Sequence, residues 1–468
     1  MHDTSHKAPV WAMRYLLFIA GMGGLLYGID IGIIAGALPY LESTASLAWK
    51  LTAQQLSFIV AAVLLGSVLS SLFAGALADL LGRRWVMFLA GALFSASIPL
   101  IALADGYTPL LLGRLLQGIS GGLIGVVVPL YLAECLPAQQ RGRGAALFQL
   151  LLTIGLVAAA LIGLLQAQTV ETATQAAQAL PEAGRIAAIF TAKDHAWRSI
   201  FWVCLTPGLV FTIGALLLAE SPRWLAQRGR IEQARQSLLR TRLPAAADIE
   251  LREMQDTPEN TAKASGKAKD PLLSRRYVLP FLLACLILAC TQATGINSIL
   301  AYVVNILNQA GLSGASANMA DVLLKVLNAV MTVVAVLLVD RKGRKFLLML
   351  GTGGIVVSLL AAGLLFRGAE AHLADVRPAI TAQVQHDGLT VHLDGATLAA
   401  LGAAADGTPQ QLTIAYAYGP FTNVKSLRSD DPVLRQVTIA REDAVQADSV
   451  IGVFFRKLHL NPFADPAA

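Results

Sequence analysis

The sequence predicts an all-α membrane protein that carries a small β-rich domain at its C-terminal end. Hydrophobic residues make up 55% of the 468 residues and charged residues only 14%, with a mean hydropathy of +0.61. A soluble protein of this length would carry about 25% charged residues. The apolar residues occur in long runs, which is typical of membrane-spanning helices. From residue 367 onward the chain is polar, with short alternating runs typical of strands.

Nine apolar runs are long enough to cross a bilayer, which needs about 20 residues per helix. They lie at 13–38, 55–78, 84–104, 109–133, 144–165, 199–219, 279–307, 319–339 and 346–366. A long polar break separates the sixth from the seventh. We therefore expect four parts: a six-helix bundle (1–219), a cytoplasmic helical linker (220–276), three further helices (277–366) and an extracytoplasmic β-rich domain or insertion (367–468).

The basic residues between the runs indicate the orientation. They cluster in the break at 220–276 and in alternate loops: Arg83 and Arg84, Arg141 and Arg143, and Arg341, Lys342, Arg344 and Lys345. The opposite loops, including a longer one at 166–198, carry fewer charges. Because cytoplasmic loops are enriched in Lys and Arg, we expect a bacterial inner-membrane protein with a cytoplasmic N-terminus. The same clustering explains the net charge of +6 without a nucleic-acid partner.

The polar segments carry weaker signals. Residues 220–276 resemble short amphipathic helices followed by a Lys/Ser/Gly linker from Thr261 to Asp270. In the C-terminal segment, the runs at 389–394, 412–418 and 436–440 alternate apolar and polar residues, which predicts strands.

One internal repeat is visible. The loop after the second run is 75-GALADLLGRR-84 and the loop after the eighth is 336-VLLVDRKGRK-345. Both contain Asp-x-x-Gly-Arg followed by Arg or Lys at the end of an apolar helix. Recurrence at equivalent places of two halves indicates a duplicated transporter.

With further motifs, this repeat resembles the sugar porter family of the major facilitator superfamily over about residues 10–366. The motifs are 26-LYGIDIGIIAGAL-38, 114-RLLQGISGGLIGVVVPLYLAE-134, 141-RG-142, 219-AESPRWL-225 and 291-TQATGIN-297. The resemblance implies twelve helices in two six-helix bundles, with a sugar site between them and alternating access. The chain would then hold a complete N-terminal bundle and half of a C-terminal one. Either the sequence is cut short after an insertion, which we favour, or it is a natural nine-span product.

Asp30 is the most informative single residue. An ionised carboxylate inside an apolar helix costs several kcal/mol unless it is paired, so such residues are functional by default. Arg114 in the fourth run is the natural partner. The resemblance implies that the two couple transport to a proton, because proton-coupled members have Asp at this place and passive members usually have Asn. A purely structural ion pair is the alternative.

The resemblance also implies a sugar site rich in amides. Amide side chains both donate to and accept from sugar hydroxyls without net charge. The family positions are Gln149, Gln292, Asn297 and Asn328, with Tyr27 and Tyr302 lining the cavity. Thr291 departs from the family, which usually has a second Gln there, so the substrate preference is open. Each amide alone could instead join two helices.

A set of charged residues at helix ends resembles the cytoplasmic gate of the family. It consists of Asp79, Arg83, Glu134, Arg141, Glu220, Arg223, Asp340 and Arg344. Such a network closes the cytoplasmic side when the carrier faces outward. Lys325 lies in the eighth run, and we expect it to form an ordinary i,i+4 pair with Asp321 near the outer interface.

The favoured function is therefore import of a monosaccharide with a proton. A facilitative uniporter, a transporter-like sugar sensor and a non-functional fragment are the alternatives. The expected partners are a monosaccharide, a proton and the lipid bilayer. The sequence contains no phosphate-binding glycine loop, no metal cluster and no nucleophile–base set, so we expect neither an enzyme nor a cofactor or metal.

Overall fold

A computed structural model describes residues 10–255, 275–309, 312, 314–370, 374–385, 388–402, 410–418, 421–429 and 431–440. Nine helical segments of this part of the chain are long and apolar enough to cross a membrane, and they coincide with the nine predicted runs. The spans are α1 (Val10–Ser43), α3 (Ala53–Leu81), α4 (Arg83–Ala102), α5 (Tyr107–Cys135), α6 (Arg141–Ala177), α7 with α8 (Glu182–Val203, Leu205–Leu216), α13 with α14 (Arg275–Gln292, Ile296–Gln309), α15 (Gly314–Lys342) and α16 (Arg344–Glu370). The fold class predicted from the sequence, an all-α membrane protein with a small C-terminal strand region, is confirmed.

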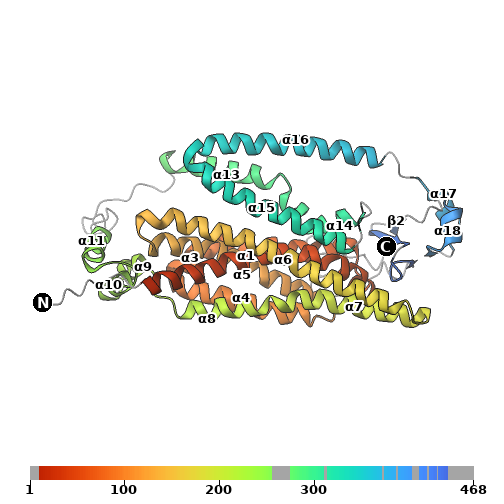
Figure 1. Ribbon diagram of the computed structural model, residues 1–468, viewed down its shortest axis with the longest axis horizontal. Coiled ribbons are helices and arrows are strands. Elements are labelled where there is room, and N and C mark those ends of the chain that lie inside the picture. Colours follow the sequence, from red (N-terminus) through yellow and green to blue (C-terminus); the bar gives the residue numbers. More distant parts are fainter. Residues whose placement is uncertain are drawn as a thin grey trace.

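The first six spans form one bundle around α1, which packs against α5, α6, α7 and α8 (Figure 1). The contact with α6 is very close, because Gly24, Gly28, Gly32 and Gly36 recur every fourth residue and present one smooth stripe. A Cβ atom at Gly28 would lie 1.9 Å from the carbonyl oxygen of Leu152. Small residues allow such close approach between membrane helices.

The prediction of a loop at 166–198 is wrong, because most of this segment is helical. α6 continues to Ala177 and α7 begins at Glu182, so that only 178–181 lie between them. The segment is rich in Ala and Gln, which favour helix. α6 has 37 residues, a length of about 55 Å at about 1.5 Å per residue. Since the hydrocarbon core is about 30 Å thick, α6 extends well beyond it.

The seventh span, predicted as one continuous run, is broken between α13 and α14. The break lies at 293–295, where Gly295 has a φ of +80° that L side chains rarely adopt. α14 packs against α1, and α15 packs against α6. The side chains of α13 and α16 are almost all exposed among the described residues, and α16 lies on the far side of α15 from the bundle (Figure 1).

The segment after the sixth span contains the predicted amphipathic helices. They are α9 (Pro222–Gln227), α10 (Ile231–Leu239) and α11 (Pro244–Gln255), and they share a small core that includes Trp224, Leu238 and Leu251. The linker predicted from Thr261 to Asp270 lies outside the described residues. A short helix, α2 (Ala45–Ala48), and the 3-10 turn η1 (Ala138–Gln140) complete the N-terminal bundle.

The C-terminal segment is a small mixed domain, as its alternation predicts. It contains α17 (Arg377–Thr381), β1 (Leu389–His392), α18 (Gly395–Ala400), β2 (Gln411–Tyr418), β3 (Phe421–Arg428) and β4 (Gln436–Ile439). β1 pairs with β4, and β2 pairs with β3, both antiparallel. Their inward side chains, among them Val391, Leu412 and Leu427, form a core of their own. β3 is not predicted by the sequence, because its residues are mostly polar.

Each of the two repeated loops has a glycine with positive φ between its two helices. Gly82 separates α3 from α4 with a φ of +96°, and Gly343 separates α15 from α16 with a φ of +81°. A residue with a Cβ would be strained in either place. The repeat therefore marks equivalent helix ends in the two halves.

The contact between α1 and α6 makes a direct prediction about stability. Replacing Gly28 by Ala forces the two helices apart, and we expect a loss of about 1–3 kcal/mol, the usual cost of overpacking. Gly75→Ala in α3 is the matched control, because a Cβ there meets nothing within 4 Å and Ala favours helix by up to about 1 kcal/mol. The measurement is the Tm of the purified full chain in detergent. Equal Tm values for the two variants would contradict the close contact.

Candidate functional site

The structure buries Asp30 and Arg114 together between α1 and α5. Asp30 is 2% exposed and Arg114 is 1% exposed. Their charges interact across the helix contact, but among the described residues no ion pair within 4.0 Å joins them. Neither carboxylate oxygen of Asp30 has a hydrogen-bond partner. Buried polar groups are nearly always hydrogen-bonded, so this carboxylate is an exception that calls for a functional reason.

A polar strip on α5 faces Asp30. Arg114, Gln117 and Gly121 follow one another at i, i+3 and i+7, and so share one face of the helix. Arg114 Nη1 donates to Gln117 Oε1 at 2.7 Å, while Arg114 Nε and Gln117 Nε2 have no partner in the described structure. A Cβ at Gly121 would lie 2.7 Å from Asp30 Oδ2, so the glycine makes room for the carboxylate. The sequence analysis missed Gln117, although its spacing from Arg114 is a usable signal.

Tyr27 belongs to the same neighbourhood. It lies one turn before Asp30 on α1, and its ring is within about 3.5 Å of the places where Cβ atoms of Gly121 and Gly125 would stand. The structure thus brings together Tyr27, Asp30 and Arg114, which the sequence selected for two separate roles.

The predicted sugar-binding amides are spread over three segments. Asn297 Nδ2 donates to Gln292 Oε1 at 2.9 Å, across the break between α13 and α14. Gln149 on α6 is exposed, and Asn328 on α15 is half-buried. Within the described residues no hydrogen bond joins Gln149 to the other amides. Tyr302 packs on the core of the N-terminal bundle.

Arg83 and Glu134 form a buried ion pair at the end of the bundle next to α9. Arg83 Nη2 donates to Glu134 Oε1 at 2.9 Å, and Arg83 Nε lies 2.9 Å from Glu134 Oε2. Asp79, which is largely exposed, lies 2.9 Å from Arg83. Ser221 donates its hydroxyl to Glu134 at 2.5 Å. Asp79, Arg83 and Glu134 therefore meet as the sequence predicts, and Ser221 joins them.

The carboxylate of Glu220 caps the first turn of α4. Its Oε1 accepts hydrogen bonds from the backbone N–H groups of Arg83 at 2.9 Å, Arg84 at 3.2 Å and Ser221 at 2.9 Å. A carboxylate is favourable there because a helix N-terminus is electropositive. Burial raises the pKa of Glu220, and the three N–H donors oppose that shift. A Cβ at Gly82 would lie 2.4 Å from Glu220 Oε2, so this site also requires the glycine of the repeat.

The remaining predicted gate residues behave differently. Arg141 donates to the Leu136 carbonyl at 3.3 Å and lies 4.0 Å from Glu250 on α11. Arg223 is exposed and lies outside the network among the described residues; Arg228 instead donates to the carbonyl of Asp79 at 2.8 Å. The side chains of Asp340 and Arg344 are outside what the structure describes. Arg242, which the sequence analysis missed, joins Glu250 to the Cys135 carbonyl.

Lys325 and Asp321 form the expected i,i+4 pair, but not near an exposed interface. Their side chains are 0% and 1% exposed, and Nζ lies 2.7 Å from Asp321 Oδ2. Lys325 also donates to the carbonyl oxygen of Gly32 on α1 at 3.4 Å. The pair therefore contacts the glycine stripe of α1 directly.

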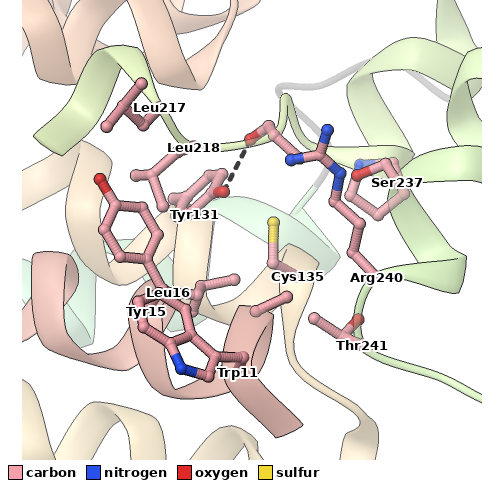
Figure 2. Close-up of a pocket in the computed structure, with 13 residues that line it drawn as sticks. Trp11, Tyr15, Leu16, Tyr131, Cys135, Leu217, Leu218, Ser237, Arg240 and Thr241 are labelled. Carbon is pink, nitrogen blue, oxygen red and sulfur yellow. Dashed lines mark hydrogen bonds between the residues drawn. The ribbon is translucent and has the colours of Figure 1, made fainter. Parts of the chain in front are cut away.

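An apolar cavity of about 440 Å³ lies at the end of the bundle next to α10 (Figure 2). Its lining includes Trp11 and Tyr15 of α1, Tyr131 of α5 and Arg240 after α10. The Tyr131 hydroxyl donates to the Ala219 carbonyl at 2.7 Å, the dashed line of Figure 2. Among the described residues the lining contains no amide side chain, and sugar hydroxyls need polar partners. This cavity therefore does not match the predicted sugar site.

The chain matches known transporters over most of its length. A sequence profile described as "Sugar (and other) transporter" matches residues 16–381. The glucose transporter GlcP of Staphylococcus epidermidis is 31% identical over 355 residues, covering 76% of this chain and 72% of GlcP. The galactose-proton symporter of Escherichia coli is 31% identical over 379 residues, covering 79% of this chain and 71% of the symporter.

Solved structures support the fold. The xylose transporter XylE of E. coli, in a partially occluded inward open conformation, is similar with a TM-score of 0.58 and 24% identity. The similar region covers 71% of this chain and 74% of XylE. Since the family profile spans well over half of the chain, the protein belongs to the sugar transporter family of the major facilitator superfamily, whose members are multi-pass membrane transporters and not enzymes.

Proposed function

We propose that this transporter imports a monosaccharide together with a proton, and that Asp30 and Arg114 couple the two. The observation that carries the proposal is the buried Asp30 carboxylate with no hydrogen-bond partner. Such a group is costly when ionised and is relieved by a proton. One similar protein is a galactose-proton symporter, which supports the same coupling here.

The proposed orientation puts the N-terminus and α9–α11 in the cytoplasm of a bacterium and residues 367–468 on the outer side of its inner membrane. The support is the basic composition of the loops around Arg83 and Arg341. The contacts of α14 and α15 with α1 involve Gly32, Gly36 and Glu42, all in the second half of α1. In this orientation those contacts close the outer side.

The proposed sugar site lies between the bundles, at Gln149, Gln292, Asn297, Asn328, Tyr27 and Tyr302. The bond between Gln292 and Asn297 spans the helix break at Gly295. A sugar hydroxyl that replaced this bond would change the geometry of the break.

The Arg83–Glu134 network, together with Glu220, is the proposed cytoplasmic gate. It acts by changing the relative populations of the outward-facing and inward-facing states.

Asp30→Asn tests the coupling. The amide cannot release a proton, so we expect uptake driven by a pH gradient to fall to simple equilibration, while exchange of labelled for unlabelled sugar persists. The measurement is accumulation of D-glucose, D-galactose and D-xylose in proteoliposomes. Asp105→Asn is the control, because Asp105 is exposed in the turn between α4 and α5. Undiminished sugar accumulation by Asp30→Asn would refute the coupling role. Sugar uptake by the wild type that does not depend on the pH gradient would indicate a uniporter.

Gln292→Leu tests the sugar site. The side chain of Gln292 is exposed, and among the described residues it bonds to Asn297, so its loss costs the fold little. If Gln292 binds sugar, KM for uptake should rise at least about tenfold, since a buried polar contact is worth about 1–3 kcal/mol. Gln236→Leu on α10 is the matched control. A lower Tm with unchanged KM would show instead that Gln292 only stabilises the helix break.

Glu134→Gln tests the gate. The change removes the charge that faces buried Arg83, and breaking a buried pair costs about 3–5 kcal/mol in the state that contains it. We expect the maximal uptake rate to fall at least about tenfold. Glu232→Gln, at an exposed position of α10, should leave the rate unchanged. Wild-type uptake by Glu134→Gln would mean that the network has no part in the transport cycle.

A further inference from the structure

A cavity of about 530 Å³ lies at the end of the molecule that carries the β-rich domain. Its walls come from the ends of α1, α6, α7, α14 and α15, and its roof comes from β2, β3 and the turn that follows them. Figure 1 shows the strands of this domain next to α14 at the end of the molecule opposite to α9–α11. The volume lies within the range of about 300–1,000 Å³ that is usual for small-molecule sites.

Two polar contacts hold the roof on the N-terminal bundle. Lys193 Nζ of α7 lies 2.5 Å from Asp431 Oδ2, with side chains only 10% and 18% exposed. The backbone N–H of Ala53, at the first turn of α3, donates to Asn423 Oδ1 at 2.9 Å. That N–H has no partner within its own helix, so Asn423, which is 6% exposed, completes the helix start.

The cavity lining carries several amide side chains. Asn305 and Asn308 of α14 and Asn318 of α15 all belong to it. Glu42 Oε2 of α1 accepts from Asn305 Nδ2 at 2.9 Å, and Asn318 Nδ2 donates to the Gly314 carbonyl at 2.8 Å. Amide and carboxylate groups gathered around one cavity suit the hydroxyl groups of a bound molecule, which both donate and accept.

The charges of the lining favour a neutral ligand. Glu42, Glu171 and Asp431 are balanced by Lys193, Lys425 and Arg428. The floor is the packed junction of α1, α6 and α15, where a Cβ at Gly36 would lie 2.9 Å from Gly163 Cα and 3.7 Å from Asn318 Oδ1. A ligand here is therefore separated from Asp30 by closed helix contacts.

We propose that this cavity is a second binding site for a neutral, polyhydroxylated ligand, and that the β-rich domain forms its roof. The ligand class, a monosaccharide, rests on the proposed function; the site itself rests on the cavity and on the amides of Asn305, Asn308 and Asn318 in its lining. The hydroxyl groups of the ligand bond to these amides and to the carboxylate of Glu42. The site exists while α14 and α15 contact α1, and it opens when they separate.

Equilibrium binding of radiolabelled D-glucose, D-galactose and D-xylose to the purified full chain tests this proposal. We expect two sugars per wild-type chain, one per Asn308→Leu chain and one per Gln292→Leu chain. Leu matches the size of Asn308 but cannot accept a hydrogen bond. Asp431→Asn weakens the roof contact from outside the membrane helices, and we expect it to lower the affinity of the second site at least tenfold without changing Tm.

The outcomes separate the two proposals. One sugar per wild-type chain that is lost in Gln292→Leu and retained in Asn308→Leu overturns the second site and leaves the proposed function intact. One sugar that is lost only in Asn308→Leu supports the cavity and overturns the amide site between the bundles. Absence of binding for all three sugars overturns the proposed function and the ligand class assigned to the cavity.

Discussion

The approach of α1 to α6 is closer than any pair of side chains would allow, and the arrangement of the other helices depends on it. Glycines at every fourth position of α1 remove the side chains from one face, so backbone meets backbone. Asp30 lies on the face of α1 that is turned toward α5, opposite Gly121. The carbonyl oxygen of Gly32, which no side chain covers, becomes an acceptor for Lys325 of α15. One stripe of glycines thereby joins the first bundle to the second half.

Two buried carboxylates of the N-terminal bundle, Glu134 and Asp30, differ in how well they are satisfied. Both carboxylate oxygens of Glu134 are bonded, one to Arg83 and one to Ser221, and such bonds rigidify their surroundings. The carboxylate of Asp30 has no such bonds, although Arg114 is in electrostatic reach. A satisfied pair holds a structural state, whereas an unsatisfied one responds to a proton or a ligand. This contrast suits a carrier, which needs a firm gate and an adjustable coupling group.

The length of α6 and α7 explains how the β-rich domain can be placed over the membrane-spanning part. α6 and the start of α7 extend beyond the hydrocarbon thickness and so provide Lys193 as an anchor for Asp431. The β-rich domain has its own core around Val391 and Leu427, so it needs only a few polar contacts to be positioned. Those contacts enclose polar lining from both halves of the transporter.

The sequence by itself determined the nine spans, because bilayer thickness requires long apolar runs that composition reveals directly. It also selected Asp30, Arg114, Arg83 and Glu134, since charges near or inside apolar helices are rare. Tertiary structure alone decided which of these side chains meet. The placement of Gln117 beside Arg114, the exclusion of Arg223 from the network and the cavity beneath Asp431 all depend on contacts between residues far apart in the chain. The break at Gly295 also escaped the sequence analysis, because a single glycine within an apolar run does not disclose its φ angle.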